Sequence, residues 1–223
     1  MVARTEAGVP GKLLILGANN PHVLRVFRAC SRADPSLELK GFIDNDPAKH
    51  GKKFCGFTIF GGHEVLSEPE FADVSLLNCI TRDARTRRLT CDELAQYDLP
   101  FANLVHPGVS LDSVSCGSGL YVLENVVVEA GVELSDHVSI HSGTIIGHET
   151  RIGRASFVAH GCAISGCVEI GSEVFVGAGA IIQPRLSIGE GAVIGSGAVV
   201  VKNVKPYDVV FGNPARRINT REK

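Results

Sequence analysis

A period of six dominates the hydrophobic pattern in the second half of the chain. Every sixth residue from Val122 to Val200 is Val, Leu or Ile, without a break in register. The anchors are Val122, Val128, Leu134, Ile140, Ile146, Ile152, Val158, Ile164, Ile170, Val176, Ile182, Ile188, Ile194 and Val200. A helix repeats its apolar face every 3.6 residues and a strand every 2, so neither explains this spacing. An ordinary β-sandwich would not keep such register. The pattern predicts a hexapeptide β-helix, in which each repeat forms one short strand and one turn around a narrow core.

Small residues accompany these anchors at two further positions of the repeat. The position four residues beyond the anchor is mostly small or aliphatic, and Cys162 falls on it, so we expect its thiol to pack in the core. Glycine recurs directly after the anchor, at Gly147, Gly153, Gly171, Gly177, Gly189 and Gly195. Because glycine adopts conformations that other residues avoid, we expect these glycines to form the turns.

The first half of the chain alternates between predicted strands and helices. Apolar strands are expected at 12–17, 37–43, 74–80 and 101–105, with helical segments near Val23, from His63 and over 83–96. This alternation predicts a small parallel α/β domain. It stops near residue 105, where the hexads begin, so the sequence predicts one domain over 1–105 and a second over 106–223 that ends in a basic tail.

Two turns of the first domain are candidates for binding a phosphate or a nucleotide. The turn at 17–22 follows a strand and opens a helix, where free backbone amides attract anions. It keeps only one glycine of the GxGxxG fingerprint, so a plain strand-to-helix turn explains it equally well. Asp44, followed by Asn45, ends the second strand, where an acid commonly meets a ribose or a base edge. The alternative for Asp44 is a turn carboxylate before Asp46-Pro47.

The net charge and the cysteine content indicate which kinds of binding partner and cellular compartment to expect. The net charge of −2 and a pI near 6.4 give no reason to expect nucleic-acid or membrane binding. We expect no apolar leader, and the apolar run at 13–16 is too short to span a bilayer. Seven cysteines without a CxxC pair predict reduced thiols in a cytoplasmic protein, rather than disulfides or a zinc knot.

Three sequence segments carry a resemblance to a known family. The chain contains GFIDND at 41–46, IIGHETRIG at 145–153 and GNPARRI at 212–218. With the hexads, they resemble the sialic acid O-acetyltransferase and bacillosamine N-acetyltransferase family of hexapeptide acyltransferases, which includes perosamine N-acetyltransferases. The resemblance covers almost the whole chain. It implies a Rossmann-like domain that binds the nucleotide of a sugar, followed by a left-handed parallel β-helix with three hexads per coil. It also implies a homotrimer with acetyl-CoA in the cleft between two subunits.

The His148-Glu149 pair is the expected catalytic centre. Acetyl transfer to an amine needs a base for the amine proton, and histidine suits this role because its ordinary pKa is near neutral. Glu149 would orient the ring and stabilise its charged form. His148 follows anchor Ile146 by two residues, so we expect it to point outward; a solvated surface histidine is the alternative, which the resemblance disfavours. One coil further, Gly166 would leave room for the acetyl group, and the resemblance implies that its backbone N–H binds the oxyanion.

The resemblance also implies the contacts with the two substrates. For the coenzyme we expect His160, Gly177, Ala178, Lys202, Arg216 and Arg217. Here the small residues would lie against the pantetheine arm and the cations would bind phosphates; otherwise they serve only turns and solubility. His160 would replace a second histidine of the relatives, at whose position this chain has Phe157. For the nucleotide-sugar we expect Asn19, Asn20, His22, Asp44, Asn45, Thr81, Arg82 and His141. His137 is expected to be solvated, and we expect no metal.

The leading hypothesis is therefore an acetyl-CoA-dependent N-acetyltransferase. Its acceptor would be the amino group of a nucleotide-linked 4-amino-4,6-dideoxy sugar, for surface glycan such as lipopolysaccharide. The sequence leaves open O-acetylation of a sugar hydroxyl, such as that of a sialic acid. Zinc lyases of the γ-carbonic anhydrase type need two histidines five residues apart, whereas those at 137, 141, 148 and 160 are spaced by 4, 7 and 12. A non-enzymatic nucleotide-binding scaffold is disfavoured by the His148-Glu149 pair.

Overall fold

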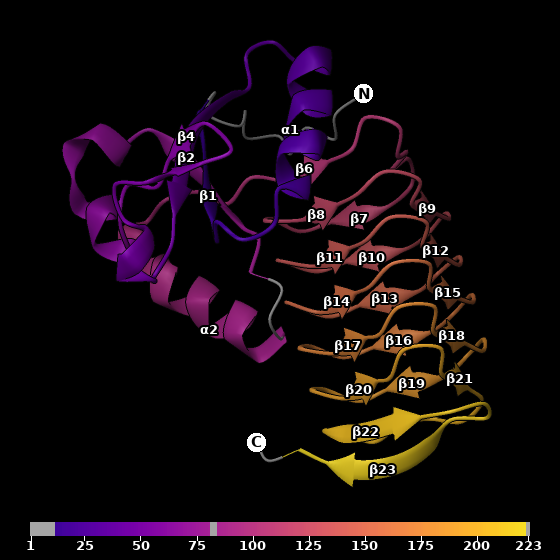
Figure 1. The fold of residues 1–223 in the computed structure, drawn as a ribbon. Coiled ribbons are helices and arrows are strands. Elements are labelled where there is room, and N and C mark those ends of the chain that lie inside the picture. The colour runs from indigo at the N-terminus through magenta and orange to yellow at the C-terminus, as the bar shows by residue number, and fades with distance from the viewer. Residues whose placement is uncertain (1–11, 81–83, 222–223) are drawn as a thin grey trace.

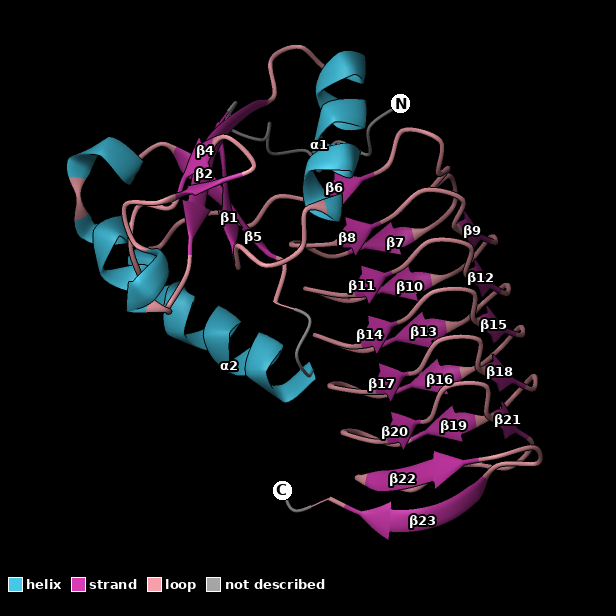
Figure 2. Cartoon of the chain, in the orientation of Figure 1, coloured by secondary structure: helices cyan, strands magenta, loops and turns pink. Residues whose placement is uncertain are grey.

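An α/β layer packs against one side of a long β-helix (Figure 1). The computed structural model describes residues 12–80 and 84–221. The secondary structure follows the predicted order, with the two long helices in the first half and short strands stacked along the second (Figure 2). The predicted fold class, a Rossmann-like domain followed by a left-handed parallel β-helix, is confirmed.

The N-terminal layer is a parallel sheet with helices beside it. Strands β1 (Lys12–Leu16), β2 (Glu38–Ile43) and β5 (Val74–Asn78) pair in the order β2-β1-β5. Between helices α1 (His22–Ala33) and α2 (Ala84–Leu94) the chain also forms a hairpin of β3 (Lys53–Phe54) and β4 (Phe57–Thr58) and three short 3-10 helices, and a fourth 3-10 helix follows α2. These short helices cover Pro47–Lys49, His63–Ser67, Pro69–Phe71 and Ala95–Tyr97, so the helix expected from His63 is of the 3-10 type. Strand β6 (Leu104–Val105) pairs with the β-helix rather than with the N-terminal sheet.

The β-helix consists of two-residue strands in three parallel ladders. They are β7 (Ser115–Cys116), β8 (Tyr121–Val122), β9 (Val127–Val128), β10 (Glu133–Leu134), β11 (Ser139–Ile140), β12 (Ile145–Ile146), β13 (Arg151–Ile152), β14 (Phe157–Val158), β15 (Ala163–Ile164), β16 (Glu169–Ile170), β17 (Phe175–Val176), β18 (Ile181–Ile182), β19 (Ser187–Ile188), β20 (Val193–Ile194) and β21 (Val199–Val200). Strand β22 (Asp208–Phe211) adds to the stack in parallel, and β23 (Arg216–Thr220) pairs with it antiparallel. Anchors eighteen residues apart are ladder partners, for example Ile146 and Ile164, which confirms three hexads per coil.

The three outer faces of the β-helix differ in character. The sheet β6-β8-β11-β14-β17-β20-β22-β23 carries the N-terminal layer on its upper strands, and we call it the covered sheet. The sheet β7-β10-β13-β16-β19 is the charged sheet, where Arg151 lies 3.1 Å from Glu133 and 3.5 Å from Glu169. The sheet β9-β12-β15-β18-β21 is the apolar sheet. Its outward residues Val127, Ile145 and Ile181 are between 43 % and 53 % exposed.

The turns use glycine differently from what the sequence predicted. The left-handed conformation occurs three residues after the anchor, at Gly143, Gly161 and Gly179 but also at Glu149 (φ 56°) and Cys167 (φ 58°). The glycines directly after the anchor serve close stacking instead. A Cβ added to Gly147 would lie 2.5 Å from the backbone nitrogen of Gly166 in the next coil. The expectation that these glycines form the turns was therefore wrong, because the coils approach too closely there for any side chain.

Buried polar contacts fix the N-terminal layer on the covered sheet. The fully buried Arg87 of α2 donates from Nη2 to the carbonyl oxygen of His137 at 2.8 Å. Arg88 Nε pairs with Glu173 Oε1 at 2.5 Å. His137 is only 4 % exposed and packs its ring 4.5 Å from that of Phe101, so the expected solvated position of His137 was wrong. Within the described parts of the chain, no helix has the length and apolarity needed to cross a membrane.

Candidate active site

His148 lies in the turn between β12 and β13, at the edge where the apolar and charged sheets meet. Its side chain is 57 % exposed, as predicted for an outward position, and Nδ1 lies 3.0 Å from Glu149 Oε2. The backbone N–H of His148 donates to Glu129 Oε2 at 2.7 Å. An ionised carboxylate can only accept hydrogen bonds, so Nδ1 must be the nitrogen that donates its proton to Glu149. In the neutral imidazole, Nε2 then keeps its lone pair. The pair therefore has the arrangement of a base with its orienting carboxylate.

The pKa of Glu149 is held below its usual range. The largest cause is the hydrogen bond with His148, followed by the bond from the Cys167 thiol, with a smaller contribution from the charge of Arg185. Glu149 thus stays ionised.

Gly166 lies directly beneath the His148 ring. A Cβ added at Gly166 would lie 2.5 Å from Nε2 and 2.8 Å from both Cδ2 and Cε1. The space that we expected an acetyl group to use is therefore occupied by the imidazole itself. The N–H of Gly166 donates no hydrogen bond to the described part of the chain. A basic nitrogen and an unengaged amide consequently lie side by side.

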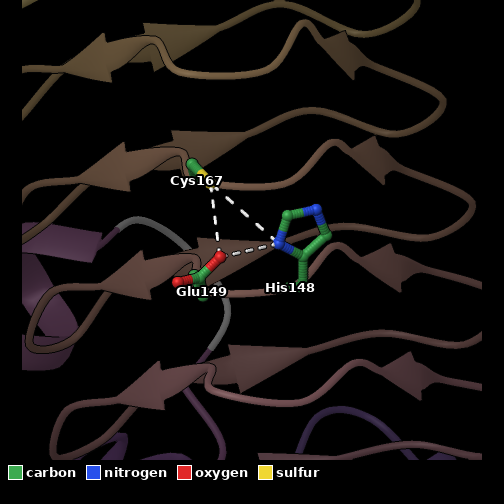
Figure 3. Close-up of side chains that lie close together, drawn as sticks. All are labelled: His148, Glu149 and Cys167. Atoms are coloured by element: carbon green, nitrogen blue, oxygen red, sulfur yellow. Dashed lines mark hydrogen bonds and ion pairs between the residues drawn. The ribbon is translucent and has the colours of Figure 1, made fainter.

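Cys167 completes a cluster that the sequence analysis missed. Its Sγ lies 3.7 Å from Glu149 Oε2 and 4.0 Å from His148 Nδ1, and the three side chains converge (Figure 3). Cys167 stacks on Glu149 because the two are eighteen residues apart, and its N–H donates to the carbonyl oxygen of His148 at 2.8 Å. The same eighteen-residue rule that selected Gly166 would have found it.

The residues expected to hold the coenzyme fall on two edges of the apolar sheet. Lys202 lies on the His148 edge, three coils further along. His160, Gly177 and Ala178 lie on the opposite edge, where the apolar sheet meets the covered sheet, and an added Cβ at Gly177 would lie 2.5 Å from the nitrogen of Ser196. Arg216 and Arg217 begin β23 and are exposed. A single chain does not gather these residues into one site.

His141 is buried rather than open to a ligand. It is 3 % exposed, with its Nδ1 3.3 Å from His160 Nε2 and its ring 4.4 Å from that of Phe157. Burial, together with the nearby His160, lowers the pKa of His141 to about 3, so the ring stays neutral at physiological pH. Its Nε2 is buried and has no partner among the described residues.

A second candidate site lies at the carboxyl ends of β1, β2 and β5. A cavity of about 240 Å³ is lined there by residues that include Gly17, Asn19, Asp44, Asn45, His63 and Thr86. Asn19, Asp44 and Asn45 were predicted to bind substrate, whereas His63 and Thr86 were missed because they come from segments without a motif. Figure 1 places this domain on the covered side of the β-helix.

Asp44 is already bonded within the protein. Oδ2 accepts from the N–H of Ala18 at 2.9 Å and from Lys49 Nζ at 2.7 Å. Burial alone would raise the pKa of Asp44, but these bonds and that from the Asp46 amide hold it below its usual value. Asp44 thus links the turn after β1 to the turn after β2, and both turns border the cavity.

Other predicted substrate residues lie outside this cavity. Asn20 Oδ1 accepts from the N–H of His22 at 3.0 Å at the start of α1. His22 Nε2 pairs with Glu124 Oε2 of the β-helix at 3.1 Å. Thr81 and Arg82 lie outside the described residues.

Comparisons with known proteins agree with this architecture. Residues 167–202 match the family described as bacterial transferase hexapeptide (six repeats). A sequence comparison with curated proteins finds no match. Among solved structures, PerB from Caulobacter crescentus, in complex with CoA and GDP-perosamine, is similar with a TM-score of 0.84 and 27% identity, over 94% of this chain and 98% of that one. A variant of perosamine N-acetyltransferase from the same species, with the same two ligands, has a TM-score of 0.85 and 26% identity over 94% and 97%. The acetyltransferase domain of PglB from Neisseria gonorrhoeae has a TM-score of 0.82 and 25% identity over 93% and 100%.

Proposed function

We propose that this chain, an acetyltransferase of the hexapeptide-repeat type as the sequence predicted, transfers the acetyl group of acetyl-CoA to the amino group of a nucleotide-linked sugar. The observation that carries the proposal is the His148-Glu149 pair lying over Gly166 on a hexapeptide coil. The similar PerB structure holds CoA and GDP-perosamine, which supports both substrate classes.

The catalytic steps assigned to this chain follow from the geometry. Bound acetyl-CoA supplies an activated thioester carbonyl. His148 Nε2 takes the proton of the attacking amine, while Nδ1–H remains bonded to Glu149, and Nε2 then gives that proton to the CoA sulfur as the carbon–sulfur bond breaks. Because Glu149 is held ionised, it stabilises the imidazolium that forms. The Gly166 N–H serves as a donor for the developing oxyanion.

The site has features that fit the coenzyme. Gly166 keeps the surface beside Nε2 free of any side chain except the imidazole, and its amide has no described partner. Lys202 lies on the same edge three coils away and offers a cation for the phosphates. The acetyl group would then meet Nε2 while the pantetheine arm follows the edge toward Lys202.

We assign nucleotide binding to residues 1–105 and catalysis to residues 106–223. The cavity bordered by Asn19, Asp44 and Asn45 offers amide groups and turn backbone to a nucleotide. It belongs to the layer that packs on the covered sheet, whereas His148 lies on the edge between the other two sheets. A chain on its own therefore separates the acceptor from the base.

A homotrimer resolves this separation. The apolar sheet exposes Val127, Ile145 and Ile181 in one row, and such a row on a flat sheet favours association. Cyclic symmetry buries this face without leaving a growing edge. In such an assembly the His160 edge of one copy approaches the His148 edge of the next, which would gather the dispersed coenzyme residues. The seven cysteines are free thiols, which supports a cytoplasmic enzyme that supplies acetylated sugar for surface glycan.

A panel of acceptors tests the function. The chain is incubated with acetyl-CoA and UDP-, dTDP- or GDP-linked 4-amino sugars, and released thiol is followed with time. Matched sugars with a hydroxyl in place of the amine are run beside them. We expect release with at least one amino sugar and none with its hydroxyl counterpart. Release only with hydroxyl sugars, or with no acceptor although acetyl-CoA binds, would overturn the proposal.

A further inference from the structure

We propose that His148, Glu149 and Cys167 form an inhibitory binding site for zinc. An imidazole nitrogen, a carboxylate oxygen and a thiol sulfur lie within 4.8 Å of one another. Figure 3 shows all three directed toward the same point. Imidazole, carboxylate and thiolate are the ligand types that zinc prefers.

The donor spacing fits a tetrahedral ion. With zinc bonds of about 2.3 Å to sulfur and about 2.0 Å to nitrogen and oxygen, tetrahedral angles place nitrogen and oxygen about 3.3 Å apart and sulfur about 3.5 Å from each. The observed separations are 3.0 Å for Nδ1 to Oε2, 4.0 Å for Sγ to Nδ1 and 3.7 Å for Sγ to Oε2. Each separation needs to change by no more than about half an ångström, which side-chain rotation supplies. A fourth position remains open to water.

The scaffold stacks the backbones of two of the three ligand residues before a metal arrives. Glu149 and Cys167 occupy the left-handed turn position of successive coils, with φ of 56° and 58°. The hydrogen bond from Cys167 N–H to the carbonyl oxygen of His148 links these turns at 2.8 Å. Glu129, which accepts from the His148 N–H, adds a second negative charge, whereas Arg185 is the opposing cation. The acidic groups outnumber the basic one.

Zinc at this site would block a base at His148. Binding releases the thiol proton to solvent and moves the imidazole proton from Nδ1 to Nε2, because the metal takes the Nδ1 lone pair. Nε2 then has no lone pair for an amine proton. This consequence rests on the proposed function, whereas metal binding itself does not. The proposed acetyl transfer uses no metal, so on that proposal zinc acts here only as an inhibitor.

Cobalt titration of the full-length protein tests the site directly. Cobalt(II) replaces zinc in such sites, and a thiolate ligand gives it a charge-transfer band in the near ultraviolet. We expect this band at one equivalent per chain, and its loss in Cys167→Ser. Competition with a chromophoric chelator should show zinc affinity at least about tenfold weaker in Cys167→Ser. Cys55→Ser is the matched control, because Cys55 likewise has a left-handed backbone, with φ of 50°, but lies exposed between β3 and β4, away from the cluster.

An activity measurement separates this proposal from the proposed function. Zinc should inhibit the wild type and Cys55→Ser equally, and the half-inhibitory concentration should rise at least about tenfold in Cys167→Ser, relative to each protein's own uninhibited rate. A missing thiolate band, or a band unchanged in Cys167→Ser, would overturn the metal site while leaving acetyl transfer intact. A thiolate band without inhibition would keep the metal site and refute His148 as the base.

Discussion

Replacing Gly166 with alanine tests the catalytic geometry without touching a polar group. The new Cβ would lie 2.5 Å from His148 Nε2, a separation that real Cβ atoms essentially never show. An ordinary carbon–nitrogen contact needs roughly 3.4 Å, so the ring must move by about 1 Å. A misplacement of that size can cost about 10²-fold in rate, and complete loss of a positioned base costs about 10²–10⁴-fold. We therefore expect kcat of Gly166→Ala to fall at least about 10²-fold.

The fold should tolerate this substitution. The backbone of Gly166 is not left-handed, and the atoms that the new methyl meets belong to a side chain that is 57 % exposed rather than to the backbone. Surface changes of this kind usually alter the free energy of unfolding by about 0.5 kcal/mol or less. The urea midpoint of Gly166→Ala should therefore match that of the wild type.

Two glycines of the same coils serve as controls. Gly161→Ala should cost about 1–2 kcal/mol of stability, since Gly161 is left-handed, and should keep its activity because nothing lies within 4 Å of the added Cβ. Gly147→Ala should destabilise the fold by roughly 1–3 kcal/mol, because it meets backbone that cannot rotate away. Thiol release from acetyl-CoA gives kcat for each protein. Near-normal kcat in Gly166→Ala would refute the inference that the imidazole acts from its position over this glycine.

Four further outcomes are expected. His148→Ala should lower kcat by about 10²–10⁴-fold while acetyl-CoA binding measured by calorimetry persists; normal turnover would show that the base lies elsewhere. Ile145→Asp should yield monomers in sedimentation and lose activity, whereas Glu133→Ala on the charged sheet should keep both; an active monomeric Ile145→Asp would contradict the shared site. Burial, the largest cause, lowers the pKa of His141 to about 3 and that of His137 to about 4, so only the unfolded chain takes up these protons below about pH 6.5. Stability should therefore fall from about pH 6.5 to about pH 4, by roughly 1 to 1.5 kcal/mol per unit for each histidine, and urea midpoints that do not change with pH would oppose this. Exhaustive chelation should leave the rate unchanged or raise it, and activity restored only by added zinc would show a metal requirement.

The repeat could be predicted from the sequence because each hexad packs only on the core and on the neighbouring coils of the stack. Each anchor must enter a core one side chain wide, so the aliphatic residues record the period directly. With three hexads per coil, residues eighteen apart stack on one another. This rule identified Gly166 next to His148 and would have identified Cys167 next to Glu149. The role of Gly147 could not be predicted, because a turn and a close approach between coils both select glycine.

The contacts between the N-terminal layer and the β-helix could not be predicted from the sequence. His137 has the same place in its repeat as Glu149, three residues after an anchor, and nothing local indicates that α2 covers one and leaves the other exposed. Likewise the bond from Arg87 to the His137 carbonyl joins residues fifty apart with no shared pattern. The candidate catalytic pair was predictable because both members are adjacent in one hexad, whereas the nucleotide cavity draws on segments whose docking only the fold determines.

The hairpin of β22 and β23 also limits the length of the stack. Every coil offers its unpaired backbone as a template for another, so a β-helix has no intrinsic end and two copies could join end to end. Here the last strand runs antiparallel to its neighbour and is exposed throughout, with Arg216 and Arg217 at its start. A reversed, positively charged edge is a poor template for a parallel coil. Removing residues 208–221 should therefore make the proposed trimer elongate into fibres, which light scattering would detect.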